Sequence, residues 1–139
     1  MTQQHASAHT IRNSAELAPA TGFAHAVVPA QGRTVYLGGQ TAQDTTGQII
    51  AGGLIEQFDT ALGNVVTALR AAGGGPGDLV NLSIYTTEVS TYRTALAELG
   101  RTYRRHLGKH YPAMALFGVA ELFDTEALVE LVGTAVIPQ

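Results

Sequence analysis

Two apolar stretches near the end of the chain decide the fold: residues 111–120, YPAMALFGVA, and residues 128–132, LVELV. Each has the composition of a β-strand, and a short polar connection joins them. One ionisable residue, Glu130, stands inside the second stretch. A carboxylate surrounded by apolar side chains is unfavourable unless something pairs with it. Glu130 therefore marks either a structural exception or a functional site.

Outward from these stretches, the chain alternates between strand and helix patterns. Further strands are expected at residues 9–14, 24–28, 33–37 and 79–86. Apolar residues recur at helical spacing between 54 and 69 and from about 91 to 107, so two helices are expected. With the final strands at 112–120 and 127–137, the predicted order is β-β-β-α-β-α-β-β. This order favours an α+β fold in which one mixed sheet carries both helices on one face.

The two final strands are apolar on both of their faces. In the last strand, one face has Leu128, Val132 and Val136, and the other has Val129, Leu131 and Ile137. Helices on one side of the sheet can cover only one of these faces. We therefore expect a homo-oligomer in which the remaining faces pack against one another.

The composition indicates one soluble domain over residues 1–139, of which 45% are apolar and 14% charged. There is no cysteine, so neither a disulfide nor a thiolate metal site is expected. The net charge of −3 argues against nucleic acid as a partner, because phosphate binding needs a concentrated basic field. Residues 1–8 are expected to form a flexible tail without the features of a signal peptide, and no stretch has the length of a membrane span. These features favour a cytoplasmic protein.

Several motifs that elsewhere carry chemistry lack their usual context here. The glycine-rich residues 73–77 follow a predicted helix and contain no lysine, which indicates a connector rather than a phosphate-binding loop. His106 and His110 are four residues apart, but no acidic residue at close spacing completes a zinc site, and no metal is expected. Four basic residues near the end of the second helix are interpreted as complementing its dipole: Arg101, Arg104, Arg105 and Lys109.

Two ionisable residues remain as candidates for catalysis, each with an alternative interpretation. Glu130 is either a carboxylate that reaches backbone amides or a neighbouring chain, or an acid/base group that holds a water molecule. His25 is either a partly exposed strand residue or a group that transfers a proton near neutral pH. The sequence leaves both pairs of alternatives open.

Six segments, taken in order and spacing, resemble the reactive-intermediate deaminase (RidA/YjgF) family: residues 22–26, 35–40, 71–73, 78–87, 111–113 and 128–131. The resemblance implies a chorismate-mutase-like α+β fold and a homotrimer with a small-molecule cleft at each subunit interface. It also implies hydrolysis of imines and enamines such as 2-aminoacrylate, giving a keto acid and ammonia without any cofactor.

Carried over by residue, the resemblance assigns the family's water-positioning glutamate to Glu130 and its aromatic cleft residue to Phe23. The family's backbone turn falls on residues 38–40, GGQ, so that Gly39 and Gln40 would hold a polar atom of the substrate. The arginine that binds the substrate carboxylate in the family is replaced by Met114. A neutral thioether cannot pair with a carboxylate, and a lost buried charge pair costs about 2–5 kcal/mol of binding.

These assignments give a divergent RidA-like enzyme as the main hypothesis. Its substrate would be a small imine, enamine or related compound, but not a standard 2-aminoacrylate. Glu130 would activate water, His25 would assist in proton transfer, and Phe23, Met114 and Leu116 would shape the pocket. The alternative is a non-catalytic trimeric module that binds or senses a small molecule. An RNA-directed factor fits poorly with the acidic balance and the few aromatic residues.

Overall fold

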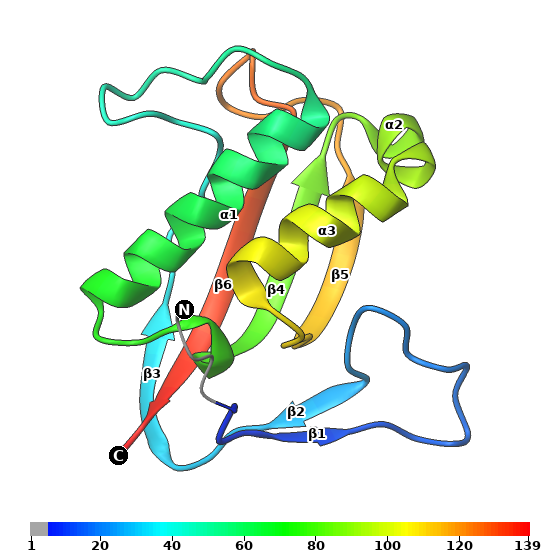
Figure 1. The fold of residues 1–139 in the computed structure, drawn as a ribbon, viewed down its shortest axis with the longest axis vertical. Helices are drawn as coiled ribbons and strands as arrows, with labels where there is room; N and C mark the ends of the chain where they lie inside the picture. Colours follow the sequence, from blue (N-terminus) through cyan, green and yellow to red (C-terminus); the bar gives the residue numbers. More distant parts are fainter. Residues whose placement is uncertain (1–5) are drawn as a thin grey trace.

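The computed structural model describes residues 6–139, which form a four-stranded sheet with helices on one face and a separate hairpin (Figure 1). The strands are β1 (Thr10–Arg12), β2 (Ala26–Val28), β3 (Gly32–Tyr36), β4 (Leu79–Thr86), β5 (Ala113–Gly118) and β6 (Val129–Pro138). The helices are α1 (Leu54–Ala71), α2 (Val89–Thr94) and α3 (Leu96–Leu107), with a 3₁₀ turn at Pro76–Asp78.

The long strand β6 lies in the middle of the sheet, whose order is β3-β6-β4-β5. It pairs antiparallel with β3 and β4, and β4 pairs parallel with the edge strand β5. A parallel pair needs a crossover between its strands, and α2 and α3 supply it. The sheet is therefore mixed, as the sequence predicts.

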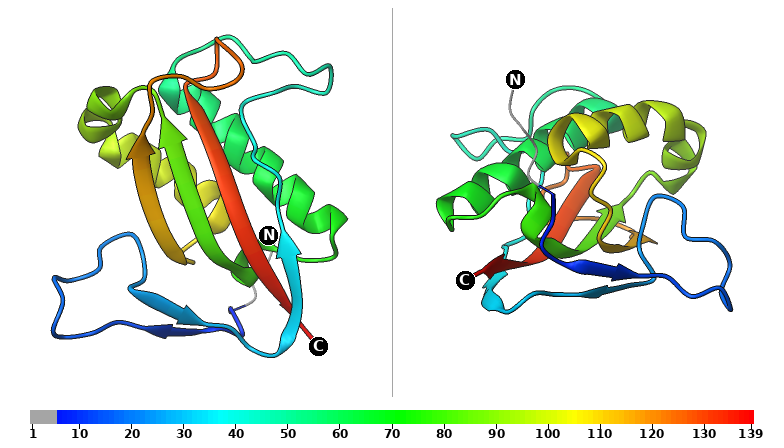
Figure 2. Two further views of the ribbon diagram at one scale, coloured as in Figure 1. Left: turned by 180° about the vertical axis from the view of Figure 1, so that it is seen from behind. Right: turned by 60° about the horizontal axis from the view of Figure 1, so that its bottom comes forward.

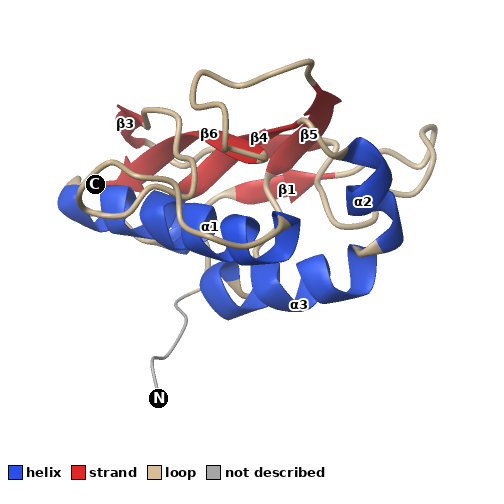
Figure 3. Ribbon diagram, turned by 90° about the horizontal axis from the view of Figure 1, so that it is seen from above, coloured by secondary structure: helices blue, strands red, loops and turns tan. Residues whose placement is uncertain are grey.

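Helices α1 and α3 cover one face of this sheet, as seen end-on in Figure 3. The apolar side of α1 packs on alternate residues of the central strands, among them Leu82, Val129 and Leu131, which are fully buried. Strand residues alternate between the two faces of a sheet, so one set of β6 side chains faces the helices and the other faces away. The α+β prediction is confirmed.

The structure corrects two details of the predicted fold. Strands β1 and β2 form their own two-stranded sheet, joined to β5 only through an isolated bridge between Ala24 and Ala113. The second predicted helix is interrupted at Ala95, giving three helices instead of two. At this break the Thr94 hydroxyl donates a hydrogen bond to the Thr91 carbonyl at 3.0 Å, a side-chain bond that bends helices.

A buried histidine ties the N-terminal hairpin to the rest of the fold. Nε2 of His9 contacts the carbonyls of Val136 at 2.9 Å and Asp78 at 3.1 Å, and Nδ1 accepts from the Ala30 amide at 3.0 Å. Before it, the Ser7 hydroxyl donates to the Gly77 carbonyl at 2.6 Å. Of the predicted flexible tail, residues 1–5 lie outside the described residues.

The other face of the sheet carries no helix, as the view from behind shows (Figure 2). Exposed aromatic and apolar side chains lie on it: Tyr36 on β3, Phe117 on β5 and Val132 on β6. We call this surface, together with Tyr85 and Glu130, the open face. Tyr85 pairs with Glu130 across β4 and β6 and with Phe117 across β4 and β5, so these three residues form one row.

Candidate functional site

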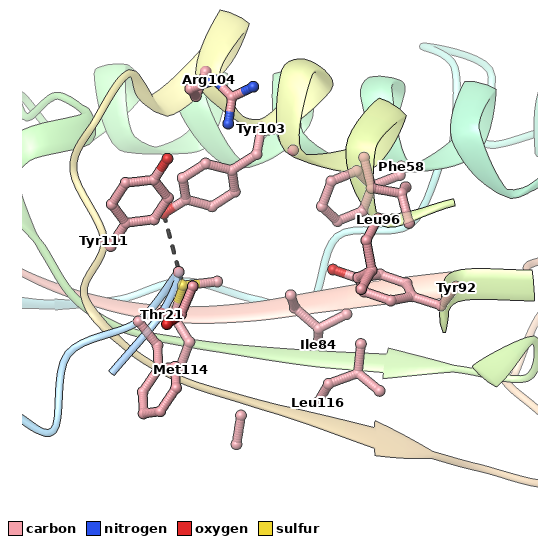
Figure 4. Close-up of a pocket in the computed structure, with 15 residues that line it drawn as sticks. Thr21, Phe58, Ile84, Tyr92, Leu96, Tyr103, Arg104, Tyr111, Met114 and Leu116 are labelled. Carbon is pink, nitrogen blue, oxygen red and sulfur yellow. Dashed lines mark hydrogen bonds between the residues drawn. The ribbon is translucent and has the colours of Figure 1, made fainter. Parts of the chain in front are cut away.

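A cavity of about 560 Å³ lies between α3 and strands β4 and β5 (Figure 4). Its volume lies in the range of small-molecule sites. Most of its lining is apolar or aromatic, and its residues come from the loops before β2 and β5, from α1, α2 and α3, and from β4 and β5. Arg104 is the one charged residue among the lining residues.

Alternation along β5 directs two predicted site residues into this cavity. Met114 and Leu116 pair with Leu82 and Ile84 of β4, whose side chains are buried beneath the helices. Both β5 residues consequently face the helices and form the floor of the cavity. Phe23, from the loop before β2, also lines it. These three predicted residues are brought together.

Two stacked tyrosines form one end of the cavity. The rings of Tyr103 and Tyr111 are 5.2 Å apart and nearly parallel, at 6°. The Tyr103 hydroxyl donates to the His110 carbonyl at 2.6 Å and lies 3.7 Å from the Met114 sulfur. Burial, with a smaller effect of Tyr111, raises the pKa of Tyr103 far above its usual value, and burial also raises the pKa of Tyr92. Both phenols therefore stay protonated near neutral pH and do not act as bases.

Glu130 lies on the other side of the sheet, on the open face. Its neighbour Tyr85 stacks on Phe117 with ring centroids 5.3 Å apart. No residue that the structure describes donates a hydrogen bond to the half-buried Glu130 carboxylate. The interpretation in which it reaches backbone amides of its own chain therefore finds no support, and its oxygens are available to a ligand or another chain.

The predicted turn lies directly against Glu130. A Cβ atom at Gly39 would lie 3.1 Å from Cδ and 3.2 Å from Oε2 of Glu130, so the missing side chain leaves room for the carboxylate. Gln40 fixes the turn by exchanging backbone hydrogen bonds with Leu131, at 2.8 and 2.9 Å. Its side-chain amide donates only a long bond of 3.4 Å to the Gly38 carbonyl. Glu130, Gly39 and Gln40 thus form a second predicted group.

The His25 ring lies edge-to-face against Phe23 of the cavity, with ring centroids 5.9 Å apart, and both of its nitrogens have backbone partners. Its Nδ1 accepts from the Ser14 amide at 3.0 Å, which leaves the proton on Nε2, and Nε2 donates to the Ala18 carbonyl at 2.9 Å. Its backbone amide donates to the Asn13 side chain at 2.8 Å. Both ring nitrogens thus contact the loop before β2, and the part of His25 in proton transfer stays a prediction.

The two histidines considered for a metal site also point to different partners. His106 bonds the Asp59 carboxylate of α1, and His110 bonds the Leu79 carbonyl of β4 at 2.8 Å. Within residues 6–139, no group of three metal-ligating side chains comes together. None of the helices in that range is long and apolar enough to span a membrane.

The predicted site is therefore split in two within one chain. Phe23, Met114 and Leu116 line the cavity under α3, whereas Glu130, Gly39 and Gln40 lie at the open face. The sequence interpretation missed the contribution of α3, above all Leu96 and Arg104. A signal for Arg104 was present, because Gly100 stands four residues before it inside a helical pattern and removes the side chain that would cover it.

Comparison with known proteins identifies the family. The profile described as Endoribonuclease L-PSP matches residues 13–137, almost the whole chain. The chain belongs to this family, the RidA/YjgF family. Among solved structures, the Rid-family protein YyfB from Yersinia pestis superposes with a TM-score of 0.83 at 31% identity, covering 93% of this chain and 98% of that one.

Curated members of the RidA/YjgF family match a shorter part of the chain at similar identity. The human protein named 2-iminobutanoate/2-iminopropanoate deaminase is 30% identical over 91 residues, which are 65% of this chain and 64% of that protein. The RutC family protein UK114 of Drosophila melanogaster is 31% identical over 100 residues, or 71% and 69% of the two chains. The matched region thus spans less than two thirds of the human relative.

Proposed function

We propose that this RidA-family chain hydrolyses a small imine or enamine without a cofactor, at a cleft between neighbouring copies of a homotrimer. Family membership supports the reaction class, and the names of the human and other relatives give the same class for those proteins. Met114 replaces the family arginine that would bind the carboxylate of a standard 2-aminoacrylate, so strand β5 would not hold that substrate in the way that the family does.

The observation that carries this proposal is the division of the site between two surfaces. The cavity can hold an apolar ligand, but no aspartate or glutamate lines it. Glu130 has a carboxylate, but it lies on the open face, away from the cavity. The open face also exposes Tyr36, Phe117 and Val132, which a neighbouring copy would cover. If Glu130 of one copy meets the cavity of the next, acid and pocket form one site.

The chemistry of Glu130 follows from its position. An enamine first takes a solvent proton on carbon and becomes the iminium ion, and an imine reaches the same state by taking a proton on nitrogen. Glu130 then accepts a proton from water as the water oxygen bonds to the iminium carbon and the π electrons move to nitrogen, giving a neutral carbinolamine. Return of that proton from Glu130 to nitrogen makes an ammonium leaving group, and the carbon–nitrogen bond breaks as the hydroxyl proton passes to the departing ammonia, leaving a carbonyl compound and ammonium. The backbone at Gly39 and Gln40 would hold the polar end of the substrate.

The test measures ammonia released from the imine of benzylamine, formed in situ by an amine oxidase, above the rate of spontaneous hydrolysis. Wild-type protein should accelerate release, and Glu130→Gln should remove the acceleration because an amide cannot accept the proton. Glu121→Gln is the matched control, since Glu121 is an exposed residue outside both halves of the site. Equal acceleration by wild type and Glu130→Gln would contradict the proposed mechanism.

A second function is favoured by one specific observation, the replacement of the family arginine by Met114. In this alternative the trimer binds or senses a small molecule without converting it. A thermal-shift screen with keto acids, imines and aromatic aldehydes separates the two functions. A binding module would be stabilised by one of these compounds and release no ammonia.

A further inference from the structure

The cavity combines apolar walls with a single cation. Among its fifteen lining residues there is no aspartate or glutamate, and Arg104 of α3 supplies the only charge. The other basic residues near the end of α3, among them Arg101 and Arg105, do not line the cavity. In Figure 4, Arg104 lies above Tyr103 and Tyr111, at the end of the cavity away from Tyr92.

Arg104 differs from the arginine that follows it. Arg105 lies 3.4 Å from the Asp59 carboxylate, a pair that joins α3 to α1. Among the residues that the structure describes, no carboxylate lies within ion-pair distance of Arg104. The Arg104 guanidinium therefore keeps its hydrogen-bond donors for solvent or for a ligand.

Gly100 makes the cavity accessible to this guanidinium. Glycine is, after proline, the least favourable residue inside a helix, and Gly100 lies within α3. All three atoms nearest to a Cβ placed at Gly100 belong to Arg104: Nη1 at 3.3 Å, and Cζ and Nη2 at 4.0 Å. The glycine both lines the cavity and lets the arginine lie across it.

We infer that the cavity binds a monoanion with an apolar, preferably aromatic body, whose carboxylate pairs with Arg104. The anion-binding group of the site thus lies on helix α3 and not on strand β5, where Met114 is neutral. One arginine suits a singly charged carboxylate, since no second lining cation is present for a phosphate dianion. The inference rests on the proposed function in one respect only, that this cavity is the ligand site.

Calorimetry with 3-phenylpropanoate and its uncharged analogue 3-phenylpropanamide tests this inference. Wild-type protein should bind the carboxylate about fivefold more tightly than the amide, since an exposed ion pair contributes up to ~1 kcal/mol. Added salt should reduce this preference. Arg104→Gln should abolish it and Arg104→Lys should keep part of it. Arg101→Gln is the matched control, because Arg101 is an exposed arginine of the same helix outside the cavity lining.

A second variant locates the ligand. Gly100→Leu places a side chain at the cavity wall against Arg104, so it should weaken binding of both compounds, and of the acid more than of the amide. Equal binding of the two compounds to wild type, binding of neither, or an equal loss in Arg101→Gln and Arg104→Gln would overturn the inference. This inference about Arg104 and the proposed reaction are tested by separate measurements. If Arg104 selects carboxylates while no imine is hydrolysed, the inference stands and the enzymatic proposal does not.

Discussion

The two faces of the four-stranded sheet differ although the same strands form them. On the helix face of β6, Val129, Leu131 and Ala135 are fully buried against the core. On the open face, Val132 of the same strand is 37% exposed, Phe117 of β5 is 46% exposed and Tyr36 of β3 is 82% exposed. One face is complete within a single chain, and the other presents apolar surface that a single chain leaves in water.

This difference suggests that one face of the sheet serves folding and the other serves function. The helix face provides the apolar burial that stabilises the domain. The open face contributes little to the stability of a single chain, but it carries Glu130, which the described residues leave without a hydrogen-bond donor. A charged residue kept within an apolar surface is typical of a site rather than of a core. The predictions below test this division.

Two neighbouring residues of β6 should give the largest contrast. Leu131→Ala creates a cavity in the core and should lower the free energy of unfolding by about 3 kcal/mol. Val132→Ala removes atoms from the open face and should lower it by about 0.5 kcal/mol. Urea unfolding followed by circular dichroism, at a protein concentration low enough to populate single chains, measures both. Similar losses for the two variants would mean that the faces do not differ in this way.

A charge on the open face should act on assembly instead of on folding. Phe117→Asp places a second carboxylate in the row that contains Glu130 and should weaken association by about 2 kcal/mol or more, roughly thirtyfold. Light scattering should show a smaller mass, while circular dichroism shows a folded chain. Arg101→Asp on the outer surface of α3 serves as the control. An unchanged mass for Phe117→Asp would place the interface elsewhere.

The smallest effect is expected on the outer side of the helix layer, where His106 and Arg105 contact Asp59. The hydrogen bond from His106, followed by the charges of His106 and Arg105, holds the pKa of Asp59 below its usual value of 3.8, against an opposing effect of desolvation. Because the pKa of Asp59 is lower in the folded chain than in the unfolded chain, ionised Asp59 stabilises the fold at any pH above its unfolded-state pKa. This contribution is lost as the pH falls through the lower, folded-state pKa.

Asp59→Asn should therefore destabilise the chain by about 0.5 kcal/mol near neutral pH, a modest value because the Asp59 side chain is 44% exposed. The difference between wild type and variant should shrink as the pH is lowered from 6 towards 3. Thermal unfolding across this range measures it. A difference that grows on acidification would contradict the assigned role of Asp59.

Local sequence patterns predicted most of the fold because they depend on near neighbours. The apolar period from Leu54 predicted α1, and the alternation in residues 79–86 predicted β4, since burial of one face dictates both patterns. The break at Ala95 was not predicted, because no proline or glycine marks it. The separate hairpin was also missed, since its anchor is the contact of His9 with Val136, far along the chain.

The site was harder to predict than the fold. The sequence located Met114, Leu116 and Phe23, and the structure brings them to one cavity. The sequence did not show that Glu130 and Met114 lie on opposite faces of the sheet, because that depends on the register between β4, β5 and β6. His25 was the weaker of the two catalytic candidates in the sequence, which did not show the two backbone hydrogen bonds that its ring makes.

Mixing two inactive variants tests most directly whether the site is shared between copies. Glu130→Gln keeps the cavity but lacks the acid, and Leu116→Trp keeps the acid but fills the cavity floor. Coexpressed in equal amounts, the two should recover ammonia release to about one quarter of the wild-type level, because about one site in four combines the intact halves. A mixture no more active than its separate components would contradict a site formed between neighbouring chains.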